Sequence, residues 1–493
     1  MIATGLRPWG TLGSKTRIAL VLAAVLLATA LFVAVADSHP DLLALAAGGL
    51  LITAIALREP RLVVPVIILA LPLEISKLLF PFFSTREELG GGLPPTSIVD
   101  VGRLAILMAA VVWLIRPNLA RWDAFAGSTL TIPALLLLAL YALSTLYARD
   151  TEAARSETLR LAFLIGFAAL IPVFVRDRAA LRWCAAALIA SAALLAVVGV
   201  YQQASGHFFW NEGLGLYGER RINTTFADPN HFARLLVEAL VLGLALFFFV
   251  SGKVRYLLLL PALAACALTL IFTGSRGAWI IAVALLPLLV LALPVARRLR
   301  LNLLLIASLA LLCALGLGLA VSPYFRDRLG TFRFGTEATG ARPYLVEAGW
   351  EMFRDHPVWG VGVGGYQDSF LNDYYYFKDP KIKANVTLSH TSTVTTIAEL
   401  GVLGAVASLF LLYRWGRLGW RLHRRSRGEA RALVLGLWAL SLVILLSSQT
   451  EGRFFDDPYL WLVFGLGVAL ERVLAADTQG QQEADARARV LPG

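Results

Sequence analysis

His390 is the residue in this sequence best suited to proton transfer. It stands in the polar segment 389–393, where the chain passes into an apolar run. A histidine that is neutral near pH 7 can accept a proton, so His390 is a candidate general base, although a polar loop residue without chemistry would fit the same pattern. Glu399 follows nine residues later, and Gly401 and Gly404 would allow close approach to a neighbouring helix.

Two arginines stand in segments that could present them to a phosphate group. Arg276 lies in the turn 274–277, Gly-Ser-Arg-Gly, between two apolar runs, and Arg342 opens the amphipathic segment 342–353. A guanidinium group makes forked, charge-assisted hydrogen bonds to a diphosphate. The competing interpretation for Arg276 is an arginine that extends its side chain to the membrane interface.

A second polar segment ends in another group of candidate ligands. Asp228 and Pro229 predict a helix start, because aspartate caps helices and proline fits their first turn. The remaining polar side chains of this segment could contact phosphate or sugar; they are Arg220, Arg221, Asn230 and His231. We also place Glu399 and Tyr366 among the substrate-binding candidates.

Several other patterns favour packing or local structure over chemistry. The Gly-rich turn 360–365 follows no strand and contains no lysine, which argues against a nucleotide loop. Aromatic residues at Tyr366 and 374–377 could stack on sugar rings or pack the loop. Asp456 and Asp457 lack a third ligand for a metal, so we interpret them as a helix cap before Pro458.

The elements that must position these residues are membrane-spanning helices. The chain has 493 residues, of which 58% are hydrophobic and only 16% charged, which excludes an ordinary soluble domain. Apolar runs long enough to cross a bilayer recur throughout. The expected spans are 18–36, 42–57, 62–80, 98–115, 128–147, 159–175, 183–201, 231–250, 256–272, 279–296, 301–321, 394–413, 432–449 and 458–474.

Charge in the short loops predicts the orientation of these spans. Alternate loops are rich in arginine, and the run 414–431 is the most basic. Basic loops stay on the cytoplasmic side, so both termini are expected inside and the loops 202–230 and 322–393 outside. We attribute the net charge of +11 and the 414–431 run to topology and anionic lipid, with no nucleic-acid partner.

These spans divide the chain into four regions. Residues 1–321 would hold helices 1–11, 322–393 the large outer loop with short helices, 394–476 the last helices, and 477–493 a disordered cytoplasmic tail. Within the spans, Arg103 and Glu238 are expected to pair or to reach the interface. The three cysteines are expected to be packing residues; they are Cys184, Cys266 and Cys313.

The order of the motifs resembles the bacterial O-antigen ligase and O-antigen polymerase (Wzy-C type) superfamily over residues 200–405. It runs from Arg221-x-x-x-Thr-Phe-x-x-Pro-Asn through the Gly-Ser-Arg-Gly turn to Pro357-x-x-Gly-x-Gly and His390-Thr, nine residues, Gly-x-x-Gly. The expected spans and the resemblance together predict an all-α polytopic membrane protein with about 12–14 spanning helices, and the resemblance implies that it is GT-C-like. Its implied activity is inverting glycosyl transfer without metal or cofactor, at the periplasmic face of the bacterial inner membrane.

The resemblance also implies the substrates and the roles of three residues. The donor would be a glycan on undecaprenyl diphosphate, and the acceptor a lipid A–core or another glycan. His390 would be the base, while Arg276 and Arg342 would hold the diphosphate. Thr391 departs from the family, which commonly has Asn, Ser or Gln there, and about fourteen helices exceed the usual dozen.

The alternatives remain an O-antigen polymerase, a protein O-oligosaccharyltransferase, or a transporter of lipid-linked glycan. A transporter would gather its ionisable residues at mid-bilayer and would show repeated halves. In this sequence these residues crowd toward one surface, which favours the transferases.

Overall fold

The computed structural model describes most of the chain from residue 101 onward and a short part before it. The described residues are 53–54, 58–73, 101–115, 127–207, 221–226, 228–302, 342–374, 389–450 and 452–490, with a few isolated positions between 304 and 326. The predicted span 18–36, nearly all of 42–57 and most of 301–321 therefore lie outside the description.

The described residues form helices and no strand. Within this described part, seven helices are long and apolar enough to cross a membrane, and four shorter apolar helices accompany them. The chain is thus an all-α polytopic membrane protein, as predicted. The helices are α3 (Val63–Ala70), α5 (Val101–Ile115), α7 (Thr131–Ser144), α8 (Thr151–Phe174), α9 (Arg178–Ser205), α10 (Pro229–Leu246), α11 (Gly252–Val254), α12 (Leu260–Phe272), α13 (Arg276–Ala292), α17 (Arg342–Asp355), α18 (Tyr366–Asn372), α19 (Ser392–Arg425), α20 (Gly428–Ser447) and α21 (Pro458–Val490).

Aspartate caps set the starts of three long helices. Asp150 accepts a hydrogen bond from Ala153 N at 2.9 Å, and Asp177 accepts one from Ala180 N at 2.8 Å. Asp228 caps α10 through Asn230 N at 2.7 Å, with Pro229 as the first helical residue, as predicted. The Asp150 cap starts α8 well before the predicted span 159–175, because a capped polar turn can extend an apolar helix beyond the bilayer.

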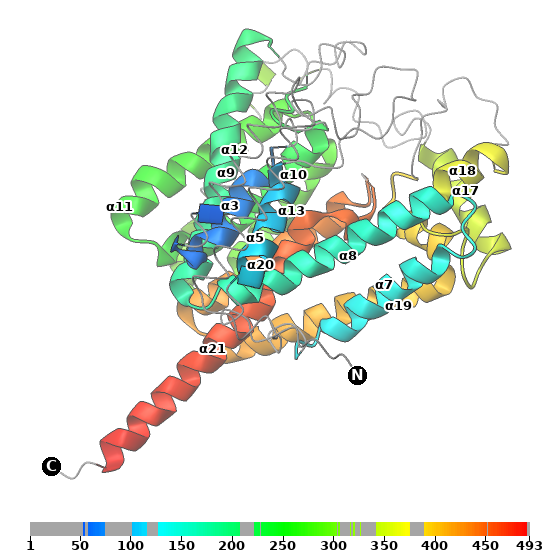
Figure 1. The fold of residues 1–493 in the computed structure, drawn as a ribbon. Coiled ribbons are helices and arrows are strands. Elements are labelled where there is room, and N and C mark those ends of the chain that lie inside the picture. The colour runs from blue at the N-terminus through cyan, green and yellow to red at the C-terminus, as the bar shows by residue number, and fades with distance from the viewer. Residues whose placement is uncertain are drawn as a thin grey trace, which may run out of the picture.

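Two groups of helices make up the bundle (Figure 1). The buried helix α10 packs against α9, α12, α13 and α20, whereas α8 packs against α7 and α21, and α19 lies along α7. Buried Arg234 and Glu238 of α10 approach to 3.6 Å one turn apart, and Arg234 reaches Asp457 at 2.6 Å. Glu238 therefore pairs within the bundle, which is one of its two predicted outcomes; the Arg103 side chain is outside the description.

The helices alternate in direction, so their ends fall into two sets. We call them the α17 end, where α19 begins, and the basic end, where α19 finishes in its arginine-rich stretch. At the basic end Arg61 lies 3.4 Å from Asp177, and Arg182 forms a two-pronged pair with Glu429. Most of the described arginine-rich loops of the predicted cytoplasmic set thus gather at one end of the bundle.

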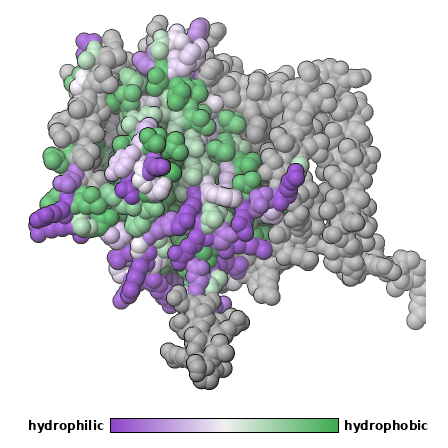
Figure 2. Space-filling model, turned by 90° about the vertical axis from the view of Figure 1, so that its left-hand side faces the viewer, coloured by the Kyte–Doolittle hydropathy of each residue, from purple (hydrophilic) through white to green (hydrophobic). Residues whose placement is uncertain are grey.

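The outer surface of the bundle suits lipid. One side shows a broad hydrophobic face edged by hydrophilic side chains (Figure 2). Large apolar side chains are exposed on α7, α9, α12, α13 and α19. Exposed leucine and valine in such numbers mark a surface that faces hydrocarbon.

Two predictions about particular segments have clear outcomes. The tail 477–493 was expected to be disordered, but α21 continues to Val490, so this expectation is wrong for residues 477–490. The polar stretch extends a helix that is already nucleated in the membrane, where propagation costs little. The predicted amphipathic helix from Arg342 is confirmed as α17, which buries Leu345 and Met352 and leaves Trp350 exposed.

Candidate functional site

His390 occupies a tight turn just before α19. Its φ of 53° is left-handed, a conformation uncommon for residues other than glycine. Ser389 Oγ accepts a hydrogen bond from Thr391 N at 3.0 Å, donates to Thr391 O at 2.8 Å and meets Thr395 Oγ1 at 2.9 Å. Because Ser389 and Thr395 are buried, they fasten the half-buried His390 to the first turn of α19.

Arg276 is the first residue of α13, after the sharp turn that the sequence predicts. Only residues 273–275 separate α12 from α13, and Gly274 has a φ of 65°. Trp279 Nε1 donates to Leu270 O at 2.9 Å and so ties the two helices together. The half-buried Arg276 therefore stands at the α17 end, at the amino terminus of a helix.

Arg221 joins its own loop to the Arg276 turn. Its Nε donates to Thr273 O, and its Nη2 donates to Asn230 Oδ1, both at 2.8 Å. His231, half-buried, is the next residue of α10. The structure thus brings Arg221, Asn230 and the Arg276 turn together, whereas Arg220 lies outside the described residues.

The end of α20 connects this group to His390. Ser392 N donates to Ser448 O at 3.1 Å, and Thr393 Oγ1 donates to Gln449 Oε1 at 2.8 Å. On the other side, a methyl group placed on Gly277 would lie 3.4 Å from Thr450 Oγ1. Residues 448–450 therefore lie between the starts of α13 and α19, and three segments far apart in sequence meet at the α17 end.

Helices α17 and α18 pack on α19 through a small core of their own. Tyr366 is fully buried there, and its hydroxyl donates to Leu345 O. Tyr374 is also buried, and its hydroxyl donates to Asp355 Oδ2 at 2.8 Å. These rings were expected either to stack on sugar or to pack the loop, and the structure shows Tyr366 and Tyr374 in packing positions. Residues 375–377 lie outside the description. For Arg342 the structure places only the backbone, at the start of α17.

Glu399 belongs to a buried ion cluster that no motif in the sequence indicates. Arg453 Nε donates to Glu399 Oε2 at 2.9 Å, and Arg453 Nη1 lies 3.1 Å from Glu157 Oε1. Arg160 lies 3.3 Å from Glu157 and 3.4 Å from Asp456. Tyr366 N donates to Glu399 Oε1 at 3.3 Å. The partners come from three distant parts of the chain, so no local spacing signals the cluster.

The cluster contains one more carboxylate than guanidinium groups. Burial, together with Glu157, raises the pKa of Asp456 to about 7 despite the neighbouring arginines. The next residue, Asp457, accepts a hydrogen bond from Tyr459 N at 2.8 Å. The predicted cap before Pro458 is thus supplied by Asp457, while Asp456 belongs to the cluster.

A break in α19 receives the Gly-rich segment that follows α17. Gly401 has a φ of 61° and a ψ of −156° inside the helix. Val361 N and Gly362 N donate to Ala398 O and Glu399 O, both at 2.9 Å. In return Val402 N donates to Pro357 O at 2.8 Å. The glycines predicted as a turn therefore allow one backbone to lie directly on another.

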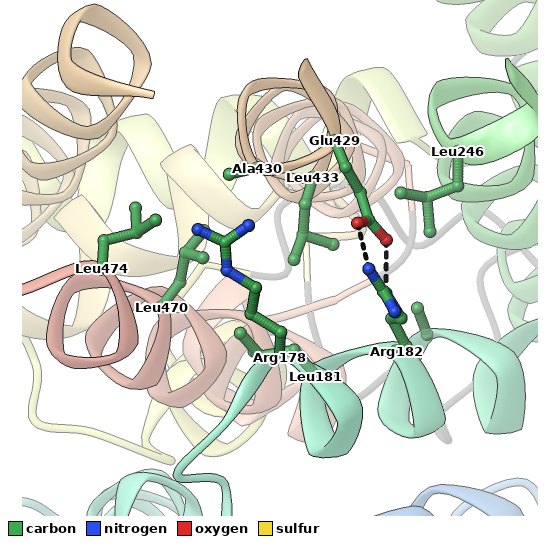
Figure 3. Close-up of a pocket in the computed structure, with 10 residues that line it drawn as sticks. Arg178, Leu181, Arg182, Leu246, Glu429, Ala430, Leu433, Leu470 and Leu474 are labelled. Carbon is green, nitrogen blue, oxygen red and sulfur yellow. Dashed lines mark hydrogen bonds and ion pairs between the residues drawn. The ribbon is translucent and has the colours of Figure 1, made fainter. Parts of the chain in front are cut away.

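Charged groups over an apolar hollow also occur at the basic end. Arg178, Arg182 and Glu429 stand over leucines of α9, α10, α20 and α21 (Figure 3). Arg182 and Glu429 face each other there, and Arg178 pairs with Asp477 at 2.8 Å. This hollow lies at the opposite end of α20 from Ser448, so it is separate from the His390 region.

Fold and site together define a polytopic helical membrane protein that brings a group of polar and charged side chains together at the α17 end of its bundle. Residues 261–409 match the protein-family model described as O-antigen ligase (Wzy_C). This match confirms the resemblance to the O-antigen ligase and polymerase superfamily. No curated protein matches the chain.

The match begins later in the chain than the predicted resemblance. It covers nearly all of α12, then α13, α17, α18 and the first half of α19, and so includes Arg276, Arg342, Tyr366, His390 and Glu399. The segment 220–231 lies outside it. Arg221 and Asn230 are therefore connected to the site by their hydrogen bonds in the structure.

Proposed function

We propose that the protein is a glycosyltransferase of the O-antigen ligase type, GT-C-like and inverting. It moves a glycan from undecaprenyl diphosphate to a hydroxyl group of lipid A–core. The observation that supports this most directly is the meeting of the Arg221, Arg276 and His390 segments at one end of the bundle. The family match fits a ligase and a polymerase of this superfamily alike. We put the ligase first because the motif resemblance is plainest around His390.

In the proposed reaction His390 is the general base. The acceptor hydroxyl oxygen attacks the anomeric carbon of the donor sugar while the imidazole removes the hydroxyl proton. The bond between that carbon and the diphosphate oxygen breaks, and undecaprenyl diphosphate leaves with the bonding electrons. Attack opposite the leaving group inverts the anomeric configuration.

The arginines stabilise the charge that develops on the leaving diphosphate. Arg276 stands at the start of α13, and α19 starts across residues 448–450. Helix amino termini carry partial positive charge and favour phosphate groups. Arg221 adds a second guanidinium group beside the Arg276 turn. We assign Arg342 the same role from its place in the family motif.

The other candidate residues divide into contacts and supports. Asn230 and His231, with Arg220, would contact the diphosphate or the first sugar. Glu399 and Tyr366 are buried and bonded to Arg453 and Leu345, so we assign them to holding α19 and the helices above it.

We place the α17 end in the periplasm and the basic end in the cytoplasm of a bacterium. The support is the concentration of arginine at the basic end, because cytoplasmic loops carry the excess of basic residues. A periplasmic site would meet the lipid-linked glycan and lipid A–core on the same side of the inner membrane.

The test uses purified protein in lipid nanodiscs with a glycan on undecaprenyl diphosphate, with and without lipid A–core. Wild type should form glycan-bearing lipid A–core, and His390→Ala should lower the rate by at least about 100-fold, the usual range for a general base. His356→Ala is the matched control, because His356 is an exposed histidine at the same end, and it should remain active.

Other outcomes would redirect the assignment. A ladder of longer lipid-linked glycans without lipid A–core would identify a polymerase of the same superfamily. Unchanged processing by His390→Ala would refute the proposed base and favour a transporter.

A further inference from the structure

The segment 357–362 carries two exposed apolar side chains at a site fixed by backbone hydrogen bonds. Val358 and Trp359 are 46% and 49% exposed, and the sequence from Pro357 to Gly365 contains no charge. In a water-filled loop such side chains would be costly to present together.

The segment is attached to α19 at the break. Beside the three bonds described above, Leu403 N donates to Val358 O at 3.4 Å. A methyl group on Gly360 would lie 2.3 Å from the Glu399 carbonyl carbon, and one on Gly401 would lie 2.3 Å from Val358 O. The two backbones are thus in direct contact. Val358 and Trp359 therefore lie at the same depth along the membrane normal as Gly401.

The length of α19 places this height within the hydrocarbon layer. Arg414 Nε donates to Thr129 O, just before α7, so both helices enter the bilayer at this level. At about 1.5 Å per residue, Gly401 is about 20 Å along the axis from Arg414. A hydrocarbon core is about 30 Å thick, and tilt brings Gly401 still closer to its middle.

The length of helix α7 gives a second estimate of the depth of Trp359 in the bilayer. Tyr147, shortly after α7 ends at Ser144, donates its hydroxyl to Trp359 O at 2.7 Å, and the two rings lie edge to face at 6.3 Å. Tyr147 is about 24 Å along the axis from Thr131, still within a 30 Å core.

The exposed side chains continue a lipid-facing surface. On α19 the exposed residues Val402, Val406 and Leu409 follow helical spacing toward Arg414, and Leu146 is exposed at the end of α7. Unpaired backbone groups at a helix break are not tolerated in hydrocarbon. The 357–362 segment supplies their partners, and its own outward side chains then meet the same lipid. Figure 1 shows α7 and α19 running side by side toward α17.

We propose that residues 357–362 form a re-entrant element whose Val358 and Trp359 insert into the bilayer leaflet at the α17 end and contact lipid acyl chains. Tryptophan beside tyrosine is typical of the membrane interface, where an apolar ring can keep one polar contact. The inference goes beyond the proposed reaction and stands without it.

Spin labelling in nanodiscs that hold one chain each tests this placement. In full-length protein with its three native cysteines replaced by alanine, V358C and W359C would carry the label. Oxygen, which partitions into lipid, should collide with both labels several-fold more often than a water-soluble nickel complex does. L409C on the exposed face of α19 is the lipid control, and D355C, exposed at the end of α17, is the aqueous control.

Two results would overturn the proposal. Labels at 358 and 359 that behave like D355C would place the segment in water, and labels shielded from both reagents would place it under protein. W359F, which carries no label, provides a second measurement. If Trp359 is inserted, this substitution should remove the part of the tryptophan fluorescence that brominated phospholipid quenches. If it removes instead the part that the water-soluble quencher acrylamide quenches, the insertion is contradicted.

Discussion

At the scale of single residues, two buried hydroxyl groups hold His390 in place. A left-handed backbone costs a residue with a side chain about 1 kcal/mol or more, so it persists only where surrounding bonds fix it. Ser389 bonds to Thr391 on one side and to Thr395 on the other. In the proposed reaction these two residues would not touch the reacting atoms and would act by positioning the imidazole.

Thr395→Val removes the hydroxyl group and keeps the shape of the side chain. We expect kcat of glycan transfer to fall about 10- to 100-fold with KM for the donor little changed, because a small displacement of a catalytic group is costly. Thr395→Ser keeps the hydroxyl group and should restore most of the rate. Equal turnover of the two variants would show that the bond to Ser389 does not matter.

Asp456 makes the ion cluster sensitive to pH. Its pKa is raised to about 7 in the folded protein, against about 3.9 in an unfolded chain. The folded state therefore binds the proton more tightly. The stability from this group is fully present below about pH 4 and is lost as the pH rises through about 7.

Asp456→Asn should consequently stabilise the protein more at pH 8 than at pH 5. We expect the gain in Tm to differ by about 2 °C between the two pH values, measured by thermal unfolding in nanodiscs. Asp373→Asn, at an exposed aspartate paired with Arg149, is the control and should show no such difference. A larger loss of Tm at pH 8 than at pH 5 would contradict the raised pKa.

The residues differ in how well the sequence alone could place them. His390 and Arg276 could be proposed from motif and turn chemistry, because glycine and serine mark a tight turn wherever it occurs. Arg453 and Glu157 could not be proposed in this way. Their partners are far away in sequence, as Arg453 and Glu399 are, 54 positions apart, and such an ion pair leaves no local pattern. The spacing of Glu399 from His390 suggests a substrate contact, yet its carboxylate accepts a hydrogen bond from Arg453.

At the scale of elements, hydropathy predicted the described spanning helices but missed the break in α19. Gly401 and Gly404 lie in an apolar run, so they looked like small residues at a helix contact. The helix breaks because residues 357–362 supply alternative backbone partners. A bond between two backbones depends little on side chains, so the sequence showed only the glycines that permit the approach.

Gly401→Ala tests whether this junction needs glycine. The added methyl group would strain a φ of 61° and meet Val358 O at 2.3 Å. We expect destabilisation of about 3 kcal/mol or more, seen as lower Tm and folded yield. Gly416→Ala, on the same helix with nothing within 4 Å of the new methyl group, is the control. It should be neutral or slightly stabilising, because alanine favours helix.

At the scale of the whole molecule, the alternation of helices separates the basic end from the α17 end. Loop charge predicted this separation, because positive residues recur in every second connection of the described helices. Hydropathy and loop charge can be read along the whole sequence, and neither depends on tertiary contacts. They could therefore indicate which loops share a side, while contacts between α12–α13, α20 and α19 had to come from the structure.

The orientation of the two ends in a cell is the remaining prediction. In a variant without native cysteines, Arg354→Cys would report on the α17 end and Arg424→Cys on the basic end, since both positions are exposed. A maleimide that cannot cross the inner membrane should label R354C in intact spheroplasts and R424C only after lysis, because arginine-rich ends remain in the cytoplasm. The reverse pattern would put His390 on the cytoplasmic side, away from any periplasmic acceptor, and the proposed ligase reaction would then be excluded.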